Sequence, residues 1–497
     1  MTRPAEASTT RSDPTALKNA GSTRLGRLFG AAAERHPGLS GFSLLSEGRE
    51  AFTVRLALAD LAEQSLDMQY YMWDGDTTGR IVVDHVMKAA DRGVRVRLLV
   101  DDPFYKDSDS IKACLDARPN VEIRLFNPLT SRRWAILDFM FDFARVNRRM
   151  HNKLMVADNA AGIVGGRNIG DIYYGVNAVA NYRDLDVLAA GPVVRDLSCV
   201  FDRFWNSPST VPIGARVDRV HGASDLKAIM ARLQEEIAAA DYPYPIAQDI
   251  DALRAKSTAL CDQLVWAPGQ IVADDPESVA AGRDSDDVIE FIRTKLAALK
   301  AELLVESPYF VLPAGAQSTV KALRARNIRV RVLTNSLASN DMLPAHSGYA
   351  RTRRLIENGM ELYELRADTY AFRPGWSPLS ARSQAALYAK AMAVRRRGGI
   401  HRQLQPRPAL GFDQHRGRPL YREPRARTAA DRPDGGRRVA RQQFSREPRA
   451  RGRAGLGDDQ GRRGGALPQR AAHRLSPAAG RQSVEAAADR VAAVMTS

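Results

Sequence analysis

Two stretches of the sequence repeat one another, and this internal repeat constrains the fold more than any other feature. The segments RGVRVRLLVDD (92–102) and RNIRVRVLTNS (326–336) both have the length and apolar content of a buried strand. Around each segment, apolar runs of strand length alternate with helical periodicity, as in SLDMQYYMW at 65–73 and the helix expected around 79–92. Such alternation is typical of α/β domains with a mainly parallel sheet. The sequence therefore predicts an α/β fold made of two similar sheet-and-helix halves.

The same pattern sets the boundaries that we predict for the parts of the chain. Residues 1–38 are expected to form a polar leader with a short helix, and residues 39–210 the first half. A polar connecting segment, 211–283, then leads to the second half, 284–394. Residues 395–497 are rich in Arg, Gly and Pro, a composition that is unsuited to a packed core. We therefore predict that an aberrant, disordered tail truncates the second half.

The charge and the cysteines exclude several classes of function. The tail has 24 Arg and 9 Asp or Glu, so it carries 24 − 9 = +15 of the net charge of +16, and residues 1–394 carry +1. A nucleic acid partner is therefore not expected, because such proteins carry their positive charge on the binding fold. The three cysteines lack metal-ligand spacing, so neither a metal nor a disulfide is expected. Without a long apolar run or a signal-peptide pattern, we expect a cytoplasmic location.

The stretch HNKLMVADNAAGIVGGRN at 151–168 combines the residue types that phosphodiester chemistry needs. It contains His151, Lys153, Asp158, Gly165, Gly166, Arg167 and Asn168. Residues two apart in a strand face the same side, so His151 and Lys153 should project together. An imidazole can attack phosphorus, while an ammonium and an amide can hold the phosphate oxygens. The alternative is a half-buried strand in which His and Lys alternate by chance, but the Asp, the glycines and the Asn in register argue against it.

This motif and its surroundings resemble those of bacterial phospholipase D-like proteins, most closely the cardiolipin synthase C type. The shared text includes SLDMQYYMW, RRMHNKLMVADN, IVGGRNIGDIYYG and HSGYARTRRLIENGMELYEL, and it extends from about Leu39 to Val394. The resemblance implies two H-x-K-x4-D motifs at one cleft, a covalent phosphohistidine-type intermediate, and no metal or other cofactor. It also implies phosphatidyl transfer between phospholipids such as phosphatidylglycerol, by a protein peripheral to the inner face of the cell membrane.

The resemblance also assigns roles to the residues of the first motif. It implies that His151 is the nucleophile and that Lys153 and Asn168 hold the phosphate. Asp158 would support the histidine or the hydrogen bonds of the motif. The two glycines should let the backbone come close to a substrate, and we expect Gly165, Gly166 and Arg167 to bind it.

The second motif departs from the family pattern. At ALYAKAMAV (386–394), family members usually read LHAKAMVVD, so Tyr388 occupies the histidine position and Lys390 is kept. Arg395 stands where the aspartate is expected. A tyrosine has a pKa of about 10, so it is a poor acid-base group near neutral pH. Lys390 is the one residue of this motif that we assign to the catalytic site.

A frameshift would explain the tail. IHRQLQPRPAL (400–410) can be encoded so that a one-base shift yields FIGSFNLDPR, which is the family's second GS-x-N segment. Its Asn falls at Gln405, fifteen positions after Lys390, just as Asn168 lies fifteen after Lys153. We therefore hypothesise a frameshift near Val394, with a genuine disordered basic arm as the alternative.

These features predict an impaired phosphatidyl transferase. Two alternatives are a phospholipase D or nuclease-like phosphodiesterase that uses water as acceptor, and a catalytically dead remnant that keeps only the fold.

Overall fold

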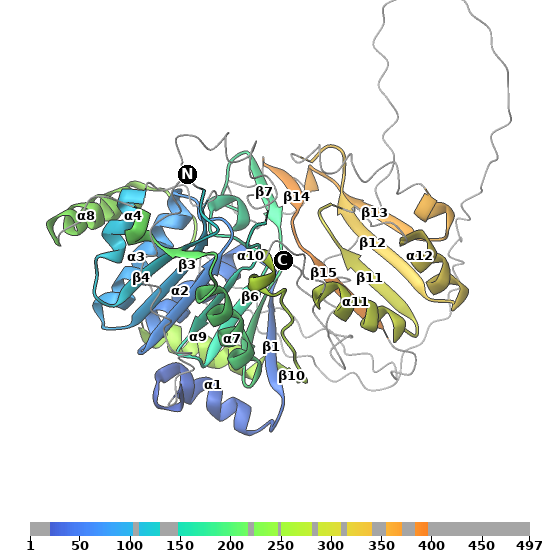
Figure 1. Cartoon of the computed structure of the whole chain (residues 1–497), viewed down its shortest axis with the longest axis horizontal. Helices are drawn as coiled ribbons and strands as arrows, with labels where there is room; N and C mark the ends of the chain where they lie inside the picture. The colour runs from blue at the N-terminus through green and yellow to red at the C-terminus, as the bar shows by residue number, and fades with distance from the viewer. Residues whose placement is uncertain are drawn as a thin grey trace, which may run out of the picture. The chain divides into compact units, whose positions relative to one another are not determined.

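The protein is described here by a computed structural model that covers most of both predicted halves. The described residues are 20–102, 109–129, 148–216, 223–246, 250–280, 287–309, 316–339, 354–369 and 383–395. The tail beyond Arg395, including Gln405, and the leader up to residue 19 lie outside these ranges. The predicted α/β class is confirmed, because helices and sheets alternate along the described chain (Figure 1).

A nine-stranded sheet forms the centre of the first half (Figure 1). Its spatial order is β10 (Val265–Ala267), β1 (Ser40–Leu45), β8 (Asp186–Ala190), β6 (Ala161–Gly165), β5 (Leu154–Ala157), β2 (Ser65–Tyr70), β3 (Arg95–Asp101), β4 (Val121–Phe126) and β9 (Thr210–Pro212). Strands β2, β3 and β4 are parallel, and the remaining neighbours are antiparallel. The expectation of a mainly parallel sheet is therefore wrong. Strands such as β5 and β6 are joined by a short turn, and without a crossover helix neighbouring strands must run antiparallel.

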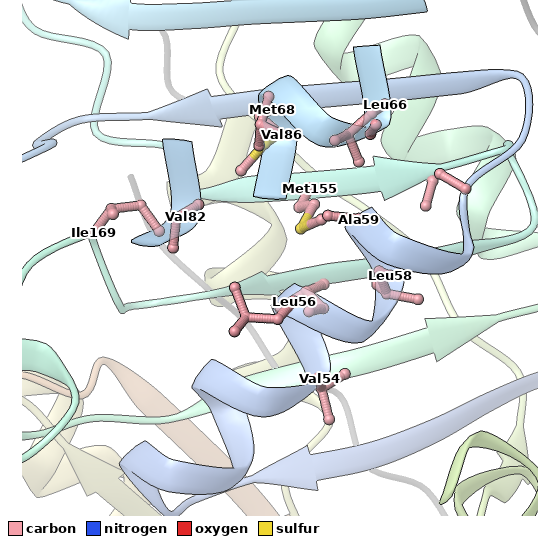
Figure 2. Packing of buried hydrophobic residues seen from close by; sticks show 14 of the residues in the cluster. Val54, Leu56, Leu58, Ala59, Leu66, Met68, Val82, Val86, Met155 and Ile169 are labelled. Carbon is pink, nitrogen blue, oxygen red and sulfur yellow. The ribbon is translucent and has the colours of Figure 1, made fainter. Parts of the chain in front are cut away.

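Helices cover both faces of this sheet. Up to residue 283, the described helices are α1 (Arg24–Glu34), α2 (Gly48–Leu61), α3 (Thr77–Asp91), α4 (Asp109–Asp116), α7 (Val193–Trp205), α8 (Ala223–Ala239), α9 (Ile250–Asp262) and α10 (Pro276–Ala280), with 3-10 turns η1 (Ala20–Ser22), η3 (Asp171–Tyr173) and η4 (Ile213–Arg216). Helices α11 (Asp287–Ala297) and α12 (Ala316–Ala325) belong to the second half, where they pack in its core. On one face, Met155 of β5 packs with Leu56 of α2 and Val82 of α3 (Figure 2). Its neighbour Leu154 joins the core on the opposite face, with Phe201 of α7. This alternation follows from the two-residue period of a strand, and it fixes the directions of the side chains of β5, which follows Lys153.

The second half repeats the central part of the first. Its sheet has the order β13 (Glu361–Leu365), β12 (Arg329–Asn335), β11 (Glu302–Glu306) and β15 (Ala391–Arg395). Strands β11, β12 and β13 are parallel and β15 is antiparallel to β11, which matches β2, β3, β4 and β5. The repeated sequence segments form β3 and β12, each the middle strand of its parallel group. The predicted duplication is therefore confirmed in the topology.

The first sheet continues from β5 to β6 and β8, and β15 is the last described strand of the second sheet. Strands equivalent to β6 and β8 would follow Arg395 in the sequence, outside the described residues.

The segment 211–283, predicted as a polar connector, contains more regular structure than expected. Strand β10 pairs with β1 and so extends the first sheet. Tyr244 is buried and donates a hydrogen bond from its hydroxyl to the carbonyl of Tyr174 at 2.7 Å. Part of this segment therefore packs as a component of the first half.

A short parallel pair joins the end of the second half to the first. Strand β14 (Gln384–Leu387) lies beside β7 (Ala180–Arg183), and the pairing runs from Gln384 opposite Ala180 to Leu387 opposite Arg183. Tyr388 follows directly, and its backbone N–H donates to the carbonyl of Arg183 at 2.8 Å. The pairing brings the second motif to the first half.

Candidate active site

The residue before each motif is held by the last residue of a repeated strand. At the end of β3, the Asp101 carboxylate accepts a hydrogen bond from the backbone N–H of Met150 at 2.9 Å. At the end of β12, the Asn335 side chain accepts from the backbone N–H of Leu387 at 2.6 Å and donates to its carbonyl at 2.9 Å. Met150 precedes His151 and Leu387 precedes Tyr388. The duplication therefore keeps the same kind of hydrogen bond to the residue before the motif in both halves.

Strand registers place the second motif in the position of the first. Strand β5 starts one residue after Lys153 and pairs with β2 from Gln69 opposite Leu154 to Leu66 opposite Ala157. Strand β15 starts one residue after Lys390 and pairs in the same way with β11. Strands β2 and β11 themselves pair in the same register with the repeated strands β3 and β12. Tyr388 therefore stands in the position that His151 occupies in the first half.

The two motifs meet at their first residues. The Tyr388 hydroxyl lies 3.4 Å from Nε2 of His151. The ring of Tyr71 lies against His151, with 4.6 Å between the ring centres, and Nζ of Lys153 lies 5.0 Å from the centre of the Tyr71 ring. Nζ of Lys390 lies 4.4 Å from the centre of the Tyr388 ring. One imidazole and two ammonium groups therefore converge, which is an arrangement suited to an anionic phosphate.

Burial dominates the electrostatics of this cluster. Desolvation, together with the positive charges of Lys153 and Lys390, lowers the pKa of His151 to about 2. Desolvation also lowers the pKa of both lysines, while the carboxylate of Asp184 opposes that shift. The imidazole is therefore neutral at physiological pH, as a nucleophile must be. Burial raises the pKa of Tyr388, so its hydroxyl keeps its proton.

Asp158 lies at the far end of β5 from His151 and caps a loop. Its carboxylate accepts hydrogen bonds from the backbone N–H groups of Glu63, Gln64 and Ser65 at 2.8–3.2 Å. These contacts fix the entry into β2, against which β5 aligns. By strand register, the second half has Arg395 in this place, and an arginine side chain has no hydrogen-bond acceptor.

The two glycines leave room for carboxylates. A Cβ on Gly165 would lie 1.9 Å from Oδ1 of Asp186, and a Cβ on Gly166 would lie 2.1 Å from Oδ1 of Asp184. Such distances are far inside van der Waals contact, so neither position accepts a larger residue without displacement. The sequence suggested that these glycines admit a substrate. In the structure, the space beside them is filled by protein.

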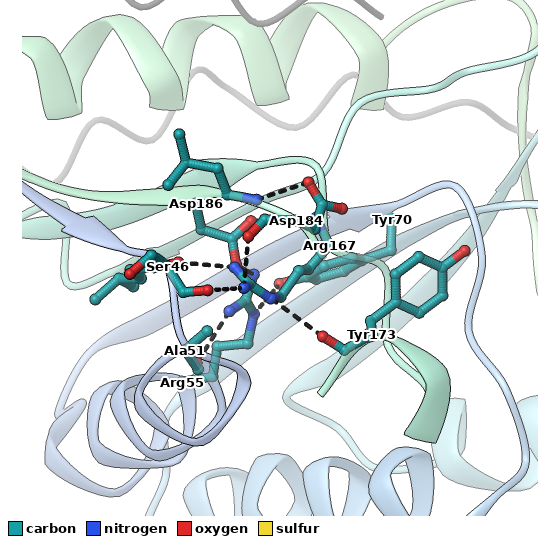
Figure 3. Close-up of polar contacts among 10 residues, drawn as sticks. Ser46, Ala51, Arg55, Tyr70, Arg167, Tyr173, Asp184 and Asp186 are labelled. Carbon is teal, nitrogen blue, oxygen red and sulfur yellow. Dashed lines mark hydrogen bonds and ion pairs between the residues drawn. The ribbon is translucent and has the colours of Figure 1, made fainter. Parts of the chain in front are cut away.

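Arg167, predicted to bind substrate, faces the interior (Figure 3). Its side chain is 1% exposed and donates to the Asp186 carboxylate and to four backbone carbonyls. Those carbonyls belong to Leu45, Ser46, Tyr173 and Asp184, at 2.6–3.1 Å. Arg55 reaches the same Asp186 carboxylate at 2.8 Å. The structure therefore gives Arg167 a role in holding β8 and the 45–46 turn together, in place of the predicted contact with substrate.

Asn168 is fully buried with both ends of its amide engaged. Its Oδ1 accepts from the backbone N–H of Met72 at 3.0 Å, and its Nδ2 donates to the Tyr173 hydroxyl at 2.8 Å. A phosphate could be held by this side chain only after these contacts change. The assignment of Asn168 as a phosphate ligand stays a prediction.

A small cavity lies behind the first motif. Its volume is about 60 Å³, and it is lined by residues 151–154 and by apolar side chains that include Leu197, Val200 and Ile271. Among the described residues, no cluster of His, Cys, Asp or Glu could hold a metal ion. No described helix combines the length and apolar character needed to cross a bilayer.

Comparison with known proteins identifies the family. Residues 56–205, which carry the whole first motif, match the family model described as "Cardiolipin synthase, PLD-like domain". Cardiolipin synthase C of Escherichia coli K12 is 37% identical over 336 residues, which are 67% of this chain and 70% of that protein. The chain belongs to the cardiolipin synthase family of phospholipase D-like proteins. The resemblance seen in the sequence is thereby confirmed.

Other relatives match different lengths of this chain. An uncharacterised protein of Helicobacter pylori 26695 is 30% identical over 359 residues, which are 70% of each chain. The major cardiolipin synthase ClsA of Bacillus subtilis 168 is 31% identical over 169 residues, which are 33% of each chain. Among solved structures, the phosphatidylserine synthase of Haemophilus influenzae Rd KW20 gives a TM-score of 0.45 at 13% identity, over 74% of this chain and 80% of that one.

Sequence reasoning missed several residues of the cardiolipin synthase-like site. Asp101 and Asn335 hold the two motifs by hydrogen bonds. The sequence contained a signal for this role, because the two residues occupy the same position in the repeated segments. Asp184 and Asp186 lie two residues apart in RDLDVLAAG, a spacing that places both on one side of a strand. Tyr71 has no signal in the sequence, since an aromatic residue at a strand end is common in any core.

Proposed function

We propose that this chain is built for phosphatidyl transfer between phospholipids such as phosphatidylglycerol, with His151 as the nucleophile. The convergence of His151 with Lys153 and Lys390 carries the proposal. A neutral imidazole would attack phosphorus and form a phosphohistidine intermediate, while the head-group alcohol of the first lipid leaves with its electron pair and takes up a proton from an acid-base group or from water. The two ammonium groups would offset the negative charge on the phosphate oxygens. An alcohol of a second lipid would then lose its proton, bond to phosphorus and break the P–N bond, which releases the histidine.

Because both substrates are lipids, the protein would work at a membrane surface, and we propose the inner face of the cell membrane. The near-neutral charge of residues 1–394 supports a lipid substrate over a nucleic acid. The E. coli relative is a cardiolipin synthase by name, which agrees with this choice of substrate.

We further propose that activity is impaired in this chain. Tyr388 stands in the histidine position of the second motif, and the loss of one acid-base group costs on the order of 10³-fold or more in rate. Arg395 cannot cap a loop as Asp158 does. The GS-x-N segment that a one-base shift restores, with its Asn fifteen positions after Lys390, supports a frameshift near Val394.

Lipid transfer is tested with vesicles of phosphatidylglycerol and phosphatidylethanolamine. Mass spectrometry would follow cardiolipin, the product of transfer, and phosphatidic acid, the product of hydrolysis. We expect little of either from the present chain, and recovery of cardiolipin when Tyr388→His is combined with the corrected reading frame. Adding His151→Ala to that double correction is the matched control, and it should abolish the product.

Three results would overturn parts of this proposal. Phosphatidic acid as the main product would indicate a hydrolase. Corrected protein that folds but makes neither product would indicate a remnant without this chemistry. Resequencing that retains the present frame would remove the frameshift.

A further inference from the structure

One contact in the site is made by Tyr388, which stands in the position of the second motif's histidine. The Tyr388 hydroxyl lies 3.4 Å from Nε2 of His151. We propose that Tyr388 caps the nucleophile, so that its hydroxyl occupies the position an incoming phosphorus needs. The proposal rests on the proposed function only in taking His151 as the nucleophile.

The geometry blocks Nε2 whichever atom donates the hydrogen. A ring nitrogen of neutral histidine has one in-plane position, which holds either a lone pair or a hydrogen. If the tyrosine donates, the lone pair that would attack phosphorus is already engaged. If Nε2 donates, it has no lone pair to attack with. A reacting phosphorus must come within about 3–3.5 Å of the nucleophile, and the tyrosine oxygen stands at that distance.

Packing keeps the cap in place. The Tyr388 ring is 8% exposed and stacks on Tyr182, with 4.9 Å between ring centres. Tyr173 meets it edge-on at 5.4 Å, and Lys390 lies over it. Moving the ring aside would expose this aromatic surface, and each aromatic pair contributes beyond its burial. The cap therefore does not open by a simple side-chain rotation.

A bound proton is not what blocks His151. Burial and the two lysines hold its pKa near 2, so the imidazole is neutral across the working pH range. A histidine at position 388 would be shorter than tyrosine and would leave space between the two rings for a phosphate. The substitution to tyrosine thus changes two things at once, because it removes an acid-base group and it covers the nucleophile.

Chemical modification of His151 tests the cap without a lipid substrate. Diethyl pyrocarbonate acylates neutral histidine, and peptide mass spectrometry can follow His151 with His36 as an internal reference in the same sample. We expect His151 in Tyr388→Phe to react about three- to tenfold faster, the effect of removing one hydrogen bond. Tyr182→Phe is the matched control, since it removes a hydroxyl from the same cluster and leaves the cap intact. An equal or lower rate in Tyr388→Phe would overturn the proposal.

An activated phosphodiester tests the same cap on phosphorus. With bis(p-nitrophenyl) phosphate, Nε2 bonds to phosphorus, p-nitrophenolate leaves with its electron pair, and the Nδ1 proton passes to water. This leaving group needs no general acid, so Tyr388→Phe and Tyr388→Ala should show a stoichiometric burst that the parent chain lacks. His151→Ala in either background should abolish it. A burst in the parent chain as fast as in the variants would overturn the cap.

The two assays distinguish the cap from the proposed function. Faster acylation of His151 without a burst in any variant, Tyr388→His included, would support the cap and refute the phosphodiester chemistry. Unchanged acylation together with a burst from the parent chain would refute the cap and support the phosphodiester chemistry.

Discussion

Replacing Arg167 with Met should destabilise the first half strongly, because the guanidinium is buried and fully engaged. It is 1% exposed, and its partners include the Asp186 carboxylate and the carbonyls of Leu45 and Ser46. Methionine fills much of the same volume but donates no hydrogen bond, so the buried carbonyls would lose this donor and Asp186 would keep Arg55 as its charged partner. Breaking a buried ion pair from one side costs about 3–5 kcal/mol. For a domain of this size, that corresponds to a fall of about 6–20 °C in the melting temperature.

Tryptophan fluorescence during heating measures this fall, and the chain offers a matched control. Arg329 forms an ion pair with Glu361 at 2.6 Å, but both side chains are well exposed. Arg329→Met should therefore cost less than about 1 kcal/mol, as exposed pairs do. Arg167→Lys keeps the charge with fewer donors and should fall between the two. If Arg167→Met melts within 2 °C of the parent chain, the buried network does not hold the fold, and the sequence-based assignment of Arg167 to substrate binding returns.

Three further predictions concern the motif itself. Asp158→Ala should speed hydrogen exchange at the three backbone amides that it caps at least tenfold, because each loses a charged acceptor; unchanged exchange would contradict the capping role. Gly166→Ala should cost about 1–3 kcal/mol in urea unfolding, since its Cβ would meet Asp184 at 2.1 Å. Gly30→Ala, in α1 with nothing within 4 Å, is the control and should be neutral or stabilising. His151 has a pKa near 2 in the fold and about 6.5 when unfolded. The unfolded chain therefore binds the extra proton between these values, and stability falls as the pH drops below 6.5. Between pH 7 and pH 5, the free energy of unfolding of His151→Phe should fall by about 1–2 kcal/mol less than that of the parent chain, after allowing for partial exposure. An equal fall in both proteins would refute the lowered pKa of His151.

The sequence predicted the parts of the site that depend on local spacing. His151 and Lys153 both reach the Tyr71 ring, although they precede β5 and do not lie in the strand that was predicted for them. The duplication follows from two similar segments. Antiparallel pairing of β5, β6 and β8 was not predicted, because apolar content does not reveal which neighbour a strand will choose. The interior position of Arg167 was not predicted either. The local sequence of an arginine after two glycines is the same whether its side chain points toward a ligand or toward Asp186. The path of β8 determines which of the two occurs.

The roles of the glycines show a similar limit. A Gly-Gly pair in a phosphate-binding motif suggests close approach of the backbone to a substrate. At Gly165 and Gly166 the close approach is made by carboxylates that lie about twenty residues later in the chain. The neighbouring carboxylates explain why both positions are glycine, and contact of these glycines with a substrate stays a prediction.

The pairing of β14 with β7 has a consequence for when the site can form. His151 and Tyr388 are 237 residues apart in the sequence, so closing this contact carries the entropy cost of a very long loop. During synthesis, the first half can fold while the segment that carries Lys390 has not yet left the ribosome. The contact between the two motifs is therefore expected to be among the last of the molecule to form, and a change late in the gene would reach this contact without disturbing the earlier folding of the sheet that supports it.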